Sequence, residues 1–194
     1  MNRKTVTIVG AGALGSHLVL LAREWEAELR VIDFDRVEAK NIRAQFHTRL
    51  GSGKNKARAI QAAMKSLFGM KLAAFSARLV DSNAEELLGG SDLVVDCTDN
   101  IAVRQVVQGF CRSGDIPCLH GCLSAGGDFA RIIWTEHFVP DREEAEGQAT
   151  CEDGRNLPFH GLAGALLAWV AQRFLEDGVR QSFQVTAGAV VRLA

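Results

Sequence analysis

The sequence carries no excess of charge of either sign. Its 194 residues include 22 Lys and Arg against 23 Asp and Glu, which gives a formal net charge of -1. Such a balance provides no broad electrostatic attraction to nucleic acid or to an anionic membrane. We therefore expect neither nucleic acid nor a membrane as a partner.

Long hydrophobic runs are also missing. No apolar run approaches the roughly 18–20 residues that cross a bilayer as a helix. The opening segment MNRKTVTIVGAGALG combines positive charges with an apolar stretch, as a secretion signal does, but glycines interrupt that stretch. We expect a cytoplasmic protein.

Paired cysteines are a third absence. The five cysteines are an odd number and contain no Cys-x-x-Cys pair, so a disulfide framework is not expected. Cys118, His120 and Cys122 alternate along a strand-like segment, where alternate residues share one face. A structural zinc site usually has four ligands, and no fourth is evident. We favour free thiols over a zinc site.

What the chain does have is an alternation of strand and helix patterns. Hydrophobic residues make up 47% of a length that suits one domain. Strands separated by helices imply βαβ units and a parallel sheet. The sequence predicts an α/β fold with a Rossmann-like, mostly parallel twisted sheet and helices on both faces. The expected strands are 5–9, 29–33, 72–79, 91–96 and 116–121, and the expected helices are 13–24, 54–68, 84–88 and 101–112.

The pattern changes after about residue 126, within what we expect to be a single domain of residues 1–194. Residues 1–126 form its core, and 127–194 add an acidic loop, a helix and antiparallel strands. The expected elements are a strand at 129–135, a loop at 136–158 interrupted by Pro140 and Pro158, an apolar helix at 159–175 and a strand-like run at 182–193. Long loops in compact domains are often functional, although a disordered connection is the alternative.

A glycine-rich turn, GAGALG, spans Gly10–Gly15. Gly10 permits the tight turn off the strand, Gly12 lets phosphate approach the backbone, and Gly15 lets the helix pack on the sheet. The helix N-terminus presents N–H groups to phosphate. Asp33 ends the next strand, where it can bond ribose hydroxyls. This context predicts nucleotide binding and leaves NAD and ATP equally suitable.

Four further blocks separate these ligands. They are Asp33-Phe34-Asp35 with Val37-Glu38, then Asn41-Ile42-Arg43-Ala44-Gln45-Phe46, then Gly53-Lys54-Asn55-Lys56-Ala57, and VVDCTDNIAVR at 94–104. In their order and spacing they resemble the ThiF/MoeB family of ubiquitin-activating-type adenylyltransferases. The resemblance is close from residue 6 to about 122 and loose beyond. It implies adenylation, in which a carboxylate attacks the α-phosphate of ATP and pyrophosphate leaves.

The residues of these blocks suit that chemistry, because its transition state gathers negative charge on phosphoryl oxygens. Lys56 begins a helix and matches the family's phosphate-contacting lysine. Asp99 matches its magnesium aspartate, and hard oxygen ligands suit Mg²⁺. Each position also has a structural alternative. Lys56 can be a plain surface lysine, Arg104 can be a surface helix residue, and Asp99 can be the N-cap of the next helix. The expected nucleotide-contacting set is Gly10, Gly12, Ala13, Gly15, Asp33, Asp35, Asn41, Gln45, Lys56, Asp99 and Asn100.

Two further positions bear on activity. Where the family pattern has Arg, this chain has Ala44, and Arg43 stands one place earlier. In related dimers that arginine reaches into the partner's active site. Here either Arg43 replaces it, or Arg3 or another group supplies the charge, or the stabilisation of the phosphates is weaker.

Cys151 lies in the acidic loop, where relatives carry a cysteine that accepts the acyl group. Neighbouring Glu152 and Asp153 disfavour its thiolate, so a plain thiol is the alternative.

Three functions follow from these residues. The leading one is ATP- and Mg²⁺-dependent adenylation of the C-terminal carboxylate of a small ubiquitin-like or sulfur-carrier protein. The second is a catalytically degenerate partner subunit, for which Ala44 is the main support. The third is an NAD(P)-dependent oxidoreductase, which the glycine turn and Asp33 alone allow and Lys56 argues against. The apolar helix at 159–175 and the dimers of related proteins predict a homodimer.

Overall fold

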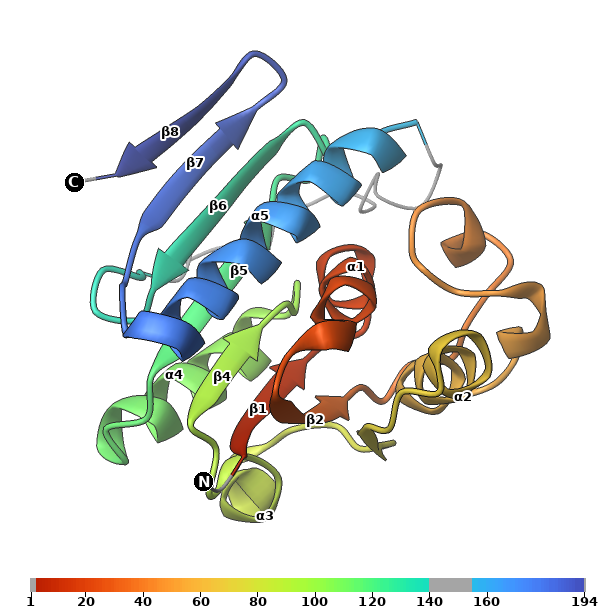
Figure 1. Cartoon of the computed structure of the whole chain (residues 1–194), viewed down its shortest axis with the longest axis horizontal. Helices are drawn as coiled ribbons and strands as arrows, with labels where there is room; N and C mark the ends of the chain where they lie inside the picture. Colours follow the sequence, from red (N-terminus) through yellow and green to blue (C-terminus); the bar gives the residue numbers. More distant parts are fainter. Residues whose placement is uncertain (1–2, 140–154, 194) are drawn as a thin grey trace.

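The computed structural model describes residues 3–139 and 155–193 and contains one eight-stranded sheet in the order β3-β2-β1-β4-β5-β6-β7-β8 (Figure 1). Strands β3, β2, β1, β4 and β5 pair in parallel, and β5 to β8 pair antiparallel. The mostly parallel sheet with antiparallel C-terminal additions is therefore confirmed. The strands are β1 (Lys4–Val9), β2 (Ala27–Ile32), β3 (Ala73–Phe75), β4 (Leu93–Asp96), β5 (Cys118–Leu123), β6 (Phe129–Trp134), β7 (Ser182–Thr186) and β8 (Ala189–Leu193).

Helices cover both faces of the sheet, as the sequence predicts. Helices α1, α2 and α5 supply the larger hydrophobic cluster on one face, and α3 and α4 supply a second cluster on the other. The helices are α1 (Ala13–Leu21), α2 (Lys56–Phe68), α3 (Ala84–Leu88), α4 (Ile101–Ser113) and α5 (Leu157–Asp177), with short 3₁₀ turns at Ala22–Glu24, Asn41–Arg43, Arg49–Gly51 and Asp81–Asn83.

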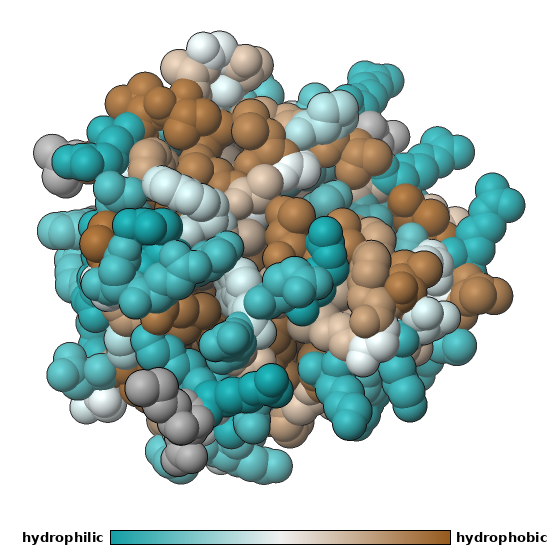
Figure 2. Space-filling model, in the orientation of Figure 1, coloured by the Kyte–Doolittle hydropathy of each residue, from teal (hydrophilic) through white to brown (hydrophobic). Residues whose placement is uncertain are grey.

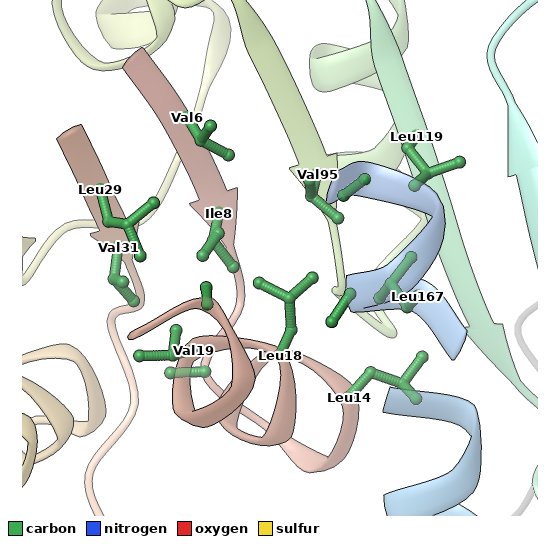
Figure 3. Packing of buried hydrophobic residues seen from close by; sticks show 14 of the residues in the cluster. Val6, Ile8, Leu14, Leu18, Val19, Leu29, Val31, Val95, Leu119 and Leu167 are labelled. Carbon is green, nitrogen blue, oxygen red and sulfur yellow. The ribbon is translucent and has the colours of Figure 1, made fainter. Parts of the chain in front are cut away.

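The central strands are apolar because they are buried on both faces. Val6 and Ile8 of β1 lie on the face of the sheet that α1 and α5 cover, in the larger cluster with Leu18 and Leu167 (Figure 3). Val9, the next residue of β1, belongs to the cluster on the opposite face. β1 therefore anchors both clusters, and the glycine turn follows directly at its carboxyl end.

Some element boundaries differ from the sequence prediction. The strand expected at 72–79 is limited to Ala73–Phe75, and the run at 182–193 is a hairpin of two strands, β7 and β8, that turns at Ala187 and Gly188. Pro158 does not interrupt the last helix but lies in its first turn, where a missing N–H costs no hydrogen bond. None of the described helices, α5 included, is long and apolar enough to cross a membrane.

We predict that Leu167→Ala lowers the free energy of unfolding by about 2–5 kcal/mol, because a fully buried side chain between α5 and the sheet leaves a cavity. Urea denaturation measures the loss. Leu67→Ala on α2 is the control, since this leucine is 57% exposed and its truncation should cost about 0.5 kcal/mol or less. Equal losses in the two variants would contradict the assigned packing.

Candidate nucleotide-binding site

A cavity of ≈ 960 Å³ opens at the carboxyl ends of β1 and β4. The chain leaves β1 toward β2 on one side, while β4 pairs with the other side of β1, so this is the point where the strand order reverses. Open α/β sheets bind ligands at such a point, and the volume suits a small molecule. Predicted site residues that line the cavity are Gly10, Gly12, Ala13, Asp33, Asp35, Gln45, Lys56, Asp99 and Asn100.

The geometry of the turn explains why Gly10 and Gly15 are glycines, and it leaves the backbone at Gly12 open. Gly10 has φ +94°, and a Cβ there would lie 3.0 Å from the Cys97 carbonyl oxygen. A Cβ at Gly15 would lie 1.9 Å from the Gly10 carbonyl oxygen, which no side chain can tolerate. A Cβ at Gly12 would meet nothing within 4 Å, so this residue leaves its side of the cavity open. Gly12 is also the N-cap of α1 and contributes no side-chain cap.

Asp33 holds the loops around the turn together. Its Oδ2 accepts a hydrogen bond of 2.7 Å from the Ala11 N–H, and its Oδ1 accepts one of 2.8 Å from the Asp35 N–H. Burial raises the pKa of the Asp33 carboxyl, against the lowering effect of these N–H groups and the Lys56 charge. Asp33 lines the cavity, as a ribose ligand must, but its first task is to shape the backbone.

Lys56 is not a surface lysine. Its side chain is 11% exposed, and its Nζ lies 3.1 Å from Asp35 Oδ2 at the cavity wall. Asn55, which sequence reasoning missed, fixes the start of α2: its Oδ1 caps the helix at Arg58 N–H, and its Nδ2 donates to the carbonyls of Asp33 and Asp35. The polar residue before Lys56 was the available signal for this cap.

Asp99 lies in the loop between β4 and α4, exposed to the cavity. The interpretation of Asp99 as the helix cap is wrong, because Asn100 Oδ1 accepts the hydrogen bond from Val103 N–H at 3.0 Å and caps α4. The Asp99 carboxylate is therefore left facing the cavity, where a hard cation can use it.

A buried polar network supports this loop. Asp96 is fully buried, and its Oδ1 accepts hydrogen bonds from the Thr98 N–H at 2.9 Å and hydroxyl at 2.8 Å. His120 Nδ1 lies 2.8 Å from Asp96 Oδ2, and Arg104 donates from Nε to the Thr98 carbonyl at 2.8 Å. Burial alone would raise the pKa of the Asp96 carboxyl, but the His120 hydrogen bond and the Arg104 charge outweigh it and lower the pKa.

This network revises the interpretation of Arg104 and also involves His120 and Cys122. Arg104 is not a surface residue, because its side chain is 13% exposed and lines the cavity. His120 is committed to Asp96, and Cys122 Sγ accepts a hydrogen bond from Arg104 Nη1 at 2.6 Å. Across residues 3–139 and 155–193, no group of three or more His, Cys, Asp or Glu side chains has a metal-binding arrangement.

The segment around Asn41–Arg43 contributes unevenly to the site. Gln45 lines the cavity, and its buried Oε1 has no hydrogen-bond partner within the described chain. Asn41 is buried away from the cavity, with its Oδ1 on the Glu38 N–H at 2.9 Å. Arg43 is exposed and does not line the cavity, while Ala44 is fully buried. Gly15 likewise acts through packing, and Cys151 lies outside the described residues.

His47 is a further residue that sequence reasoning missed. It is 7% exposed, and its Nε2 lies 2.9 Å from the Ala11 carbonyl oxygen. The Phe46 N–H donates to Ser16 Oγ at 2.9 Å. These two contacts tie the segment after Gln45 to the glycine turn and the first turn of α1. A lone histidine in a loop gives no sequence signal for such a role.

The sheet, the glycine turn and the polar cavity define an α/β protein with a Rossmann-like fold and a candidate nucleotide site. The family model for the ThiF family matches residues 1–173, and the chain belongs to the ThiF family. The resemblance seen in the sequence is confirmed by this match.

Several curated proteins are similar to the chain. It is 36% identical to the SAMP-activating enzyme E1 of Haloferax volcanii over 121 residues, 61% of this chain and 45% of that enzyme. It is 32% identical to the adenylyltransferase and sulfurtransferase MOCS3 of Anopheles gambiae over 87% of this chain and 40% of that protein. It is 29% identical to the molybdopterin-synthase adenylyltransferase of Salmonella typhimurium over 88% of this chain and 72% of that enzyme. The chain thus spans less than half the length of the first two relatives.

Among solved structures, E. coli MccB with ATP has a TM-score of 0.76 to this chain at 19% identity, covering 98% of this chain and 62% of that one. At this identity the likeness shows the fold alone. It confirms the Rossmann-like architecture that the sequence predicts.

We predict that alanine at Gly15 lowers the stability of the fold, whereas alanine at Gly12 weakens ligand binding. Gly15→Ala should destabilise the fold by about 1–3 kcal/mol or more, because its Cβ overlaps the Gly10 carbonyl. Gly12→Ala should change stability by about 0.5 kcal/mol or less, because its Cβ enters open space, yet weaken ATP binding. Thermal melting and calorimetric titration separate the two effects. A strongly destabilised Gly12→Ala variant would refute the assigned geometry.

Proposed function

We propose that the chain binds ATP with Mg²⁺ in the cytoplasm and adenylates the C-terminal carboxylate of a small ubiquitin-like or sulfur-carrier protein. The observation that carries the proposal is the meeting of the open Gly12 backbone, Lys56 and Asp99 in one cavity. The names of the relatives support it, since they describe a SAMP-activating enzyme and adenylyltransferases.

The reaction needs positioning and charge stabilisation rather than covalent help. A carboxylate oxygen attacks the α-phosphorus, the bond to the bridging oxygen of pyrophosphate breaks, and pyrophosphate leaves with that electron pair. The N–H groups at the start of α1 face the phosphates as donors. The Lys56 ammonium has three N–H donors and uses one on Asp35 in this structure, which leaves donors for phosphate oxygens.

The residues present fit a magnesium site at Asp99. Its carboxylate faces the cavity, and Asn100 rather than Asp99 caps the helix, so the carboxylate remains available as a hard oxygen ligand. Mg²⁺ held there would supply positive charge beside the phosphates. The buried Asp96 and Arg104 hold the Thr98 backbone, so the loop that carries Asp99 is fixed before any ligand arrives.

The second candidate function is a degenerate subunit that keeps the fold without turnover. Ala44, at the position of the family's arginine, is fully buried and supplies no charge. Arg43 is exposed and does not line the cavity of its own chain, so it assists catalysis only if it reaches a partner's cavity. Lys56 and Arg104 are cations that this chain itself brings to the cavity, and they favour the active enzyme.

Cys151 is the proposed acceptor of the activated acyl group in a later thioester step, with a plain thiol as the alternative. In that step the thiolate attacks the acyl carbon, and AMP leaves with the carboxylate oxygen that joined it to the acyl group. Cys151 is not needed for the adenylation step.

The chain is also proposed to form a homodimer. Apolar side chains gather over the region of the surface where α5 and the β7–β8 hairpin lie (Figure 2). The exposed large apolar residues of these elements include Leu162, Trp169, Val190 and Val191. This is the surface that we propose the two chains bury, since exposed apolar patches mark interaction sites.

For assembly, we predict a mass of twice the 21.0 kDa chain by light scattering at micromolar concentration. Trp169→Glu should shift the mass toward that of one chain, because a buried charge without a partner opposes association. Lys65→Glu on α2, an exposed residue outside α5 and the β7–β8 hairpin, is the control. A monomeric wild-type chain would reject the dimer.

For the ligand, we predict that calorimetric titration gives tighter binding of ATP with Mg²⁺ than of NAD. Lys56 at the cavity wall and the Asp99 carboxylate suit a triphosphate and its metal. Tighter binding of NAD would favour an oxidoreductase and sink the adenylation proposal.

For the chemistry, we predict that Lys56→Ala and Asp99→Ala each lower ATP–pyrophosphate exchange with the cognate carrier roughly 100- to 1000-fold, with melting close to the wild type. Each removes a charge that stabilises the transition state more than the ground state. Lys54→Ala is the matched control, because Lys54 is exposed two residues before Lys56 and does not line the cavity. Cys151→Ala should leave exchange intact.

These variants also distinguish the candidate functions. Persistence of exchange in both Lys56→Ala and Asp99→Ala would show that the site assignment is wrong. No exchange by the wild-type chain with any carrier, alongside measurable ATP binding, would favour the degenerate subunit.

A further inference from the structure

The imidazole of His47 packs against the glycine turn from outside the cavity. Its Nε2 lies 2.9 Å from the Ala11 carbonyl oxygen, and the side chain is buried. The neighbouring hydrogen bond from Phe46 N–H to Ser16 Oγ holds the backbone of this segment against α1. The backbone that carries His47 is therefore held in place independently of the contact with Ala11.

The contact with Ala11 has a direct consequence for Gly12. The Ala11 carbonyl and the Gly12 N–H belong to the same peptide unit, which is planar and trans, so they point in opposite directions. A group that holds the carbonyl on one side therefore aims the N–H to the other side. Gly12 lines the cavity, and its N–H donates to no group in the described chain.

Because residue 12 is a glycine, the peptide between Ala11 and Gly12 needs the His47 contact to hold its orientation. A glycine backbone adopts many conformations at similar energy, so the sequence does not by itself fix the rotation of the peptide before Gly12. The preceding peptide is fixed by Asp33 Oδ2, which accepts the Ala11 N–H at 2.7 Å. The peptide between Ala11 and Gly12 is fixed by His47. The two side chains together hold both peptides that flank Ala11.

The protonation state of His47 follows from its surroundings. A carbonyl oxygen only accepts, so Nε2 carries the hydrogen. Burial lowers the pKa of His47 to about 4, the hydrogen bond to Ala11 opposes this, and the charges of Lys56 and His17 lower it further. At neutral pH the ring is therefore neutral, and its Nδ1 is an acceptor with no partner within residues 3–139 and 155–193.

We propose that His47 is a positioning residue that holds the Ala11–Gly12 peptide so that the Gly12 N–H faces the phosphates of bound nucleotide. This inference rests on the proposed binding of ATP. His47 touches neither nucleotide nor carboxylate and acts through Gly12. Its loss should weaken the binding of phosphate-bearing ligands and leave the nucleoside part of the site unchanged.

The test compares His47→Gln with His47→Met by calorimetric titration of ATP–Mg²⁺ and of adenosine. The two substitutes are unbranched and similar in size, but only glutamine has an N–H donor for the Ala11 carbonyl. We expect His47→Met to bind ATP roughly 10- to 100-fold more weakly, the loss that follows from one misdirected hydrogen bond to a charged group. His47→Gln should regain most of this affinity, and both should bind adenosine as the wild type does.

Two results would overturn the inference. One is wild-type ATP affinity in His47→Met. The other is an equal loss in both variants with a parallel loss of adenosine binding, which would mark a general structural role. A wild-type chain that binds adenosine and ATP with equal affinity, or neither, would instead overturn the proposed function, and the inference with it.

Discussion

The arrangement of the site depends on the Asp33 carboxylate at the end of β2. One oxygen accepts the Ala11 N–H in the glycine turn, and the other accepts the Asp35 N–H in its own loop. The Asp35 carbonyl then accepts the Lys56 N–H at 2.8 Å, and the Asp35 side chain pairs with Lys56 Nζ. A single buried carboxylate therefore holds the cavity-lining backbone of the glycine turn and the Lys56 cation in one frame. Ribose binding by Asp33 would add to this role without replacing it.

The charges in the cavity form two groups supported by different parts of the sheet. Asp33, Asp35 and Lys56 lie beyond β2, and Asp99 and Arg104 lie beyond β4, supported by the buried Asp96 at the end of that strand. In each group one carboxylate is buried and committed to backbone N–H groups, while another faces the cavity. Committed carboxylates rigidify the loops, so that Lys56 and Asp99 meet a ligand with little reorganisation, as electrostatic catalysis requires.

The sequence predicted the parts of this account that follow from local pattern. Periodicity located most strands and helices, and the spacing of Gly10, Gly12 and Gly15 defined their separate roles. It did not predict contacts that depend on how distant segments meet. The caps at Asn55 and Asn100 were missed, and which carboxylate remained available to a ligand depended on backbone geometry. His47 and His120 act through partners 36 and 24 residues away in the chain, and Arg104 also reaches Cys122, 18 residues away, which no local pattern encodes. The sequence predicts one strand-like run at 182–193, and the turn at Ala187 and Gly188 that divides it into a hairpin was not predicted.

The central claim is that a carboxylate is activated by attack on the α-phosphate in this cavity. The most direct measurement uses a carrier protein labelled with ¹⁸O in its C-terminal carboxylate, incubated with the chain, ATP and Mg²⁺, followed by transfer of the acyl group to a thiol. Attack of the thiol on the acyl carbon leaves one carboxylate oxygen on the released AMP. The account predicts AMP that carries one ¹⁸O and pyrophosphate that carries none. Unlabelled AMP, or ADP with labelled phosphate, would contradict it.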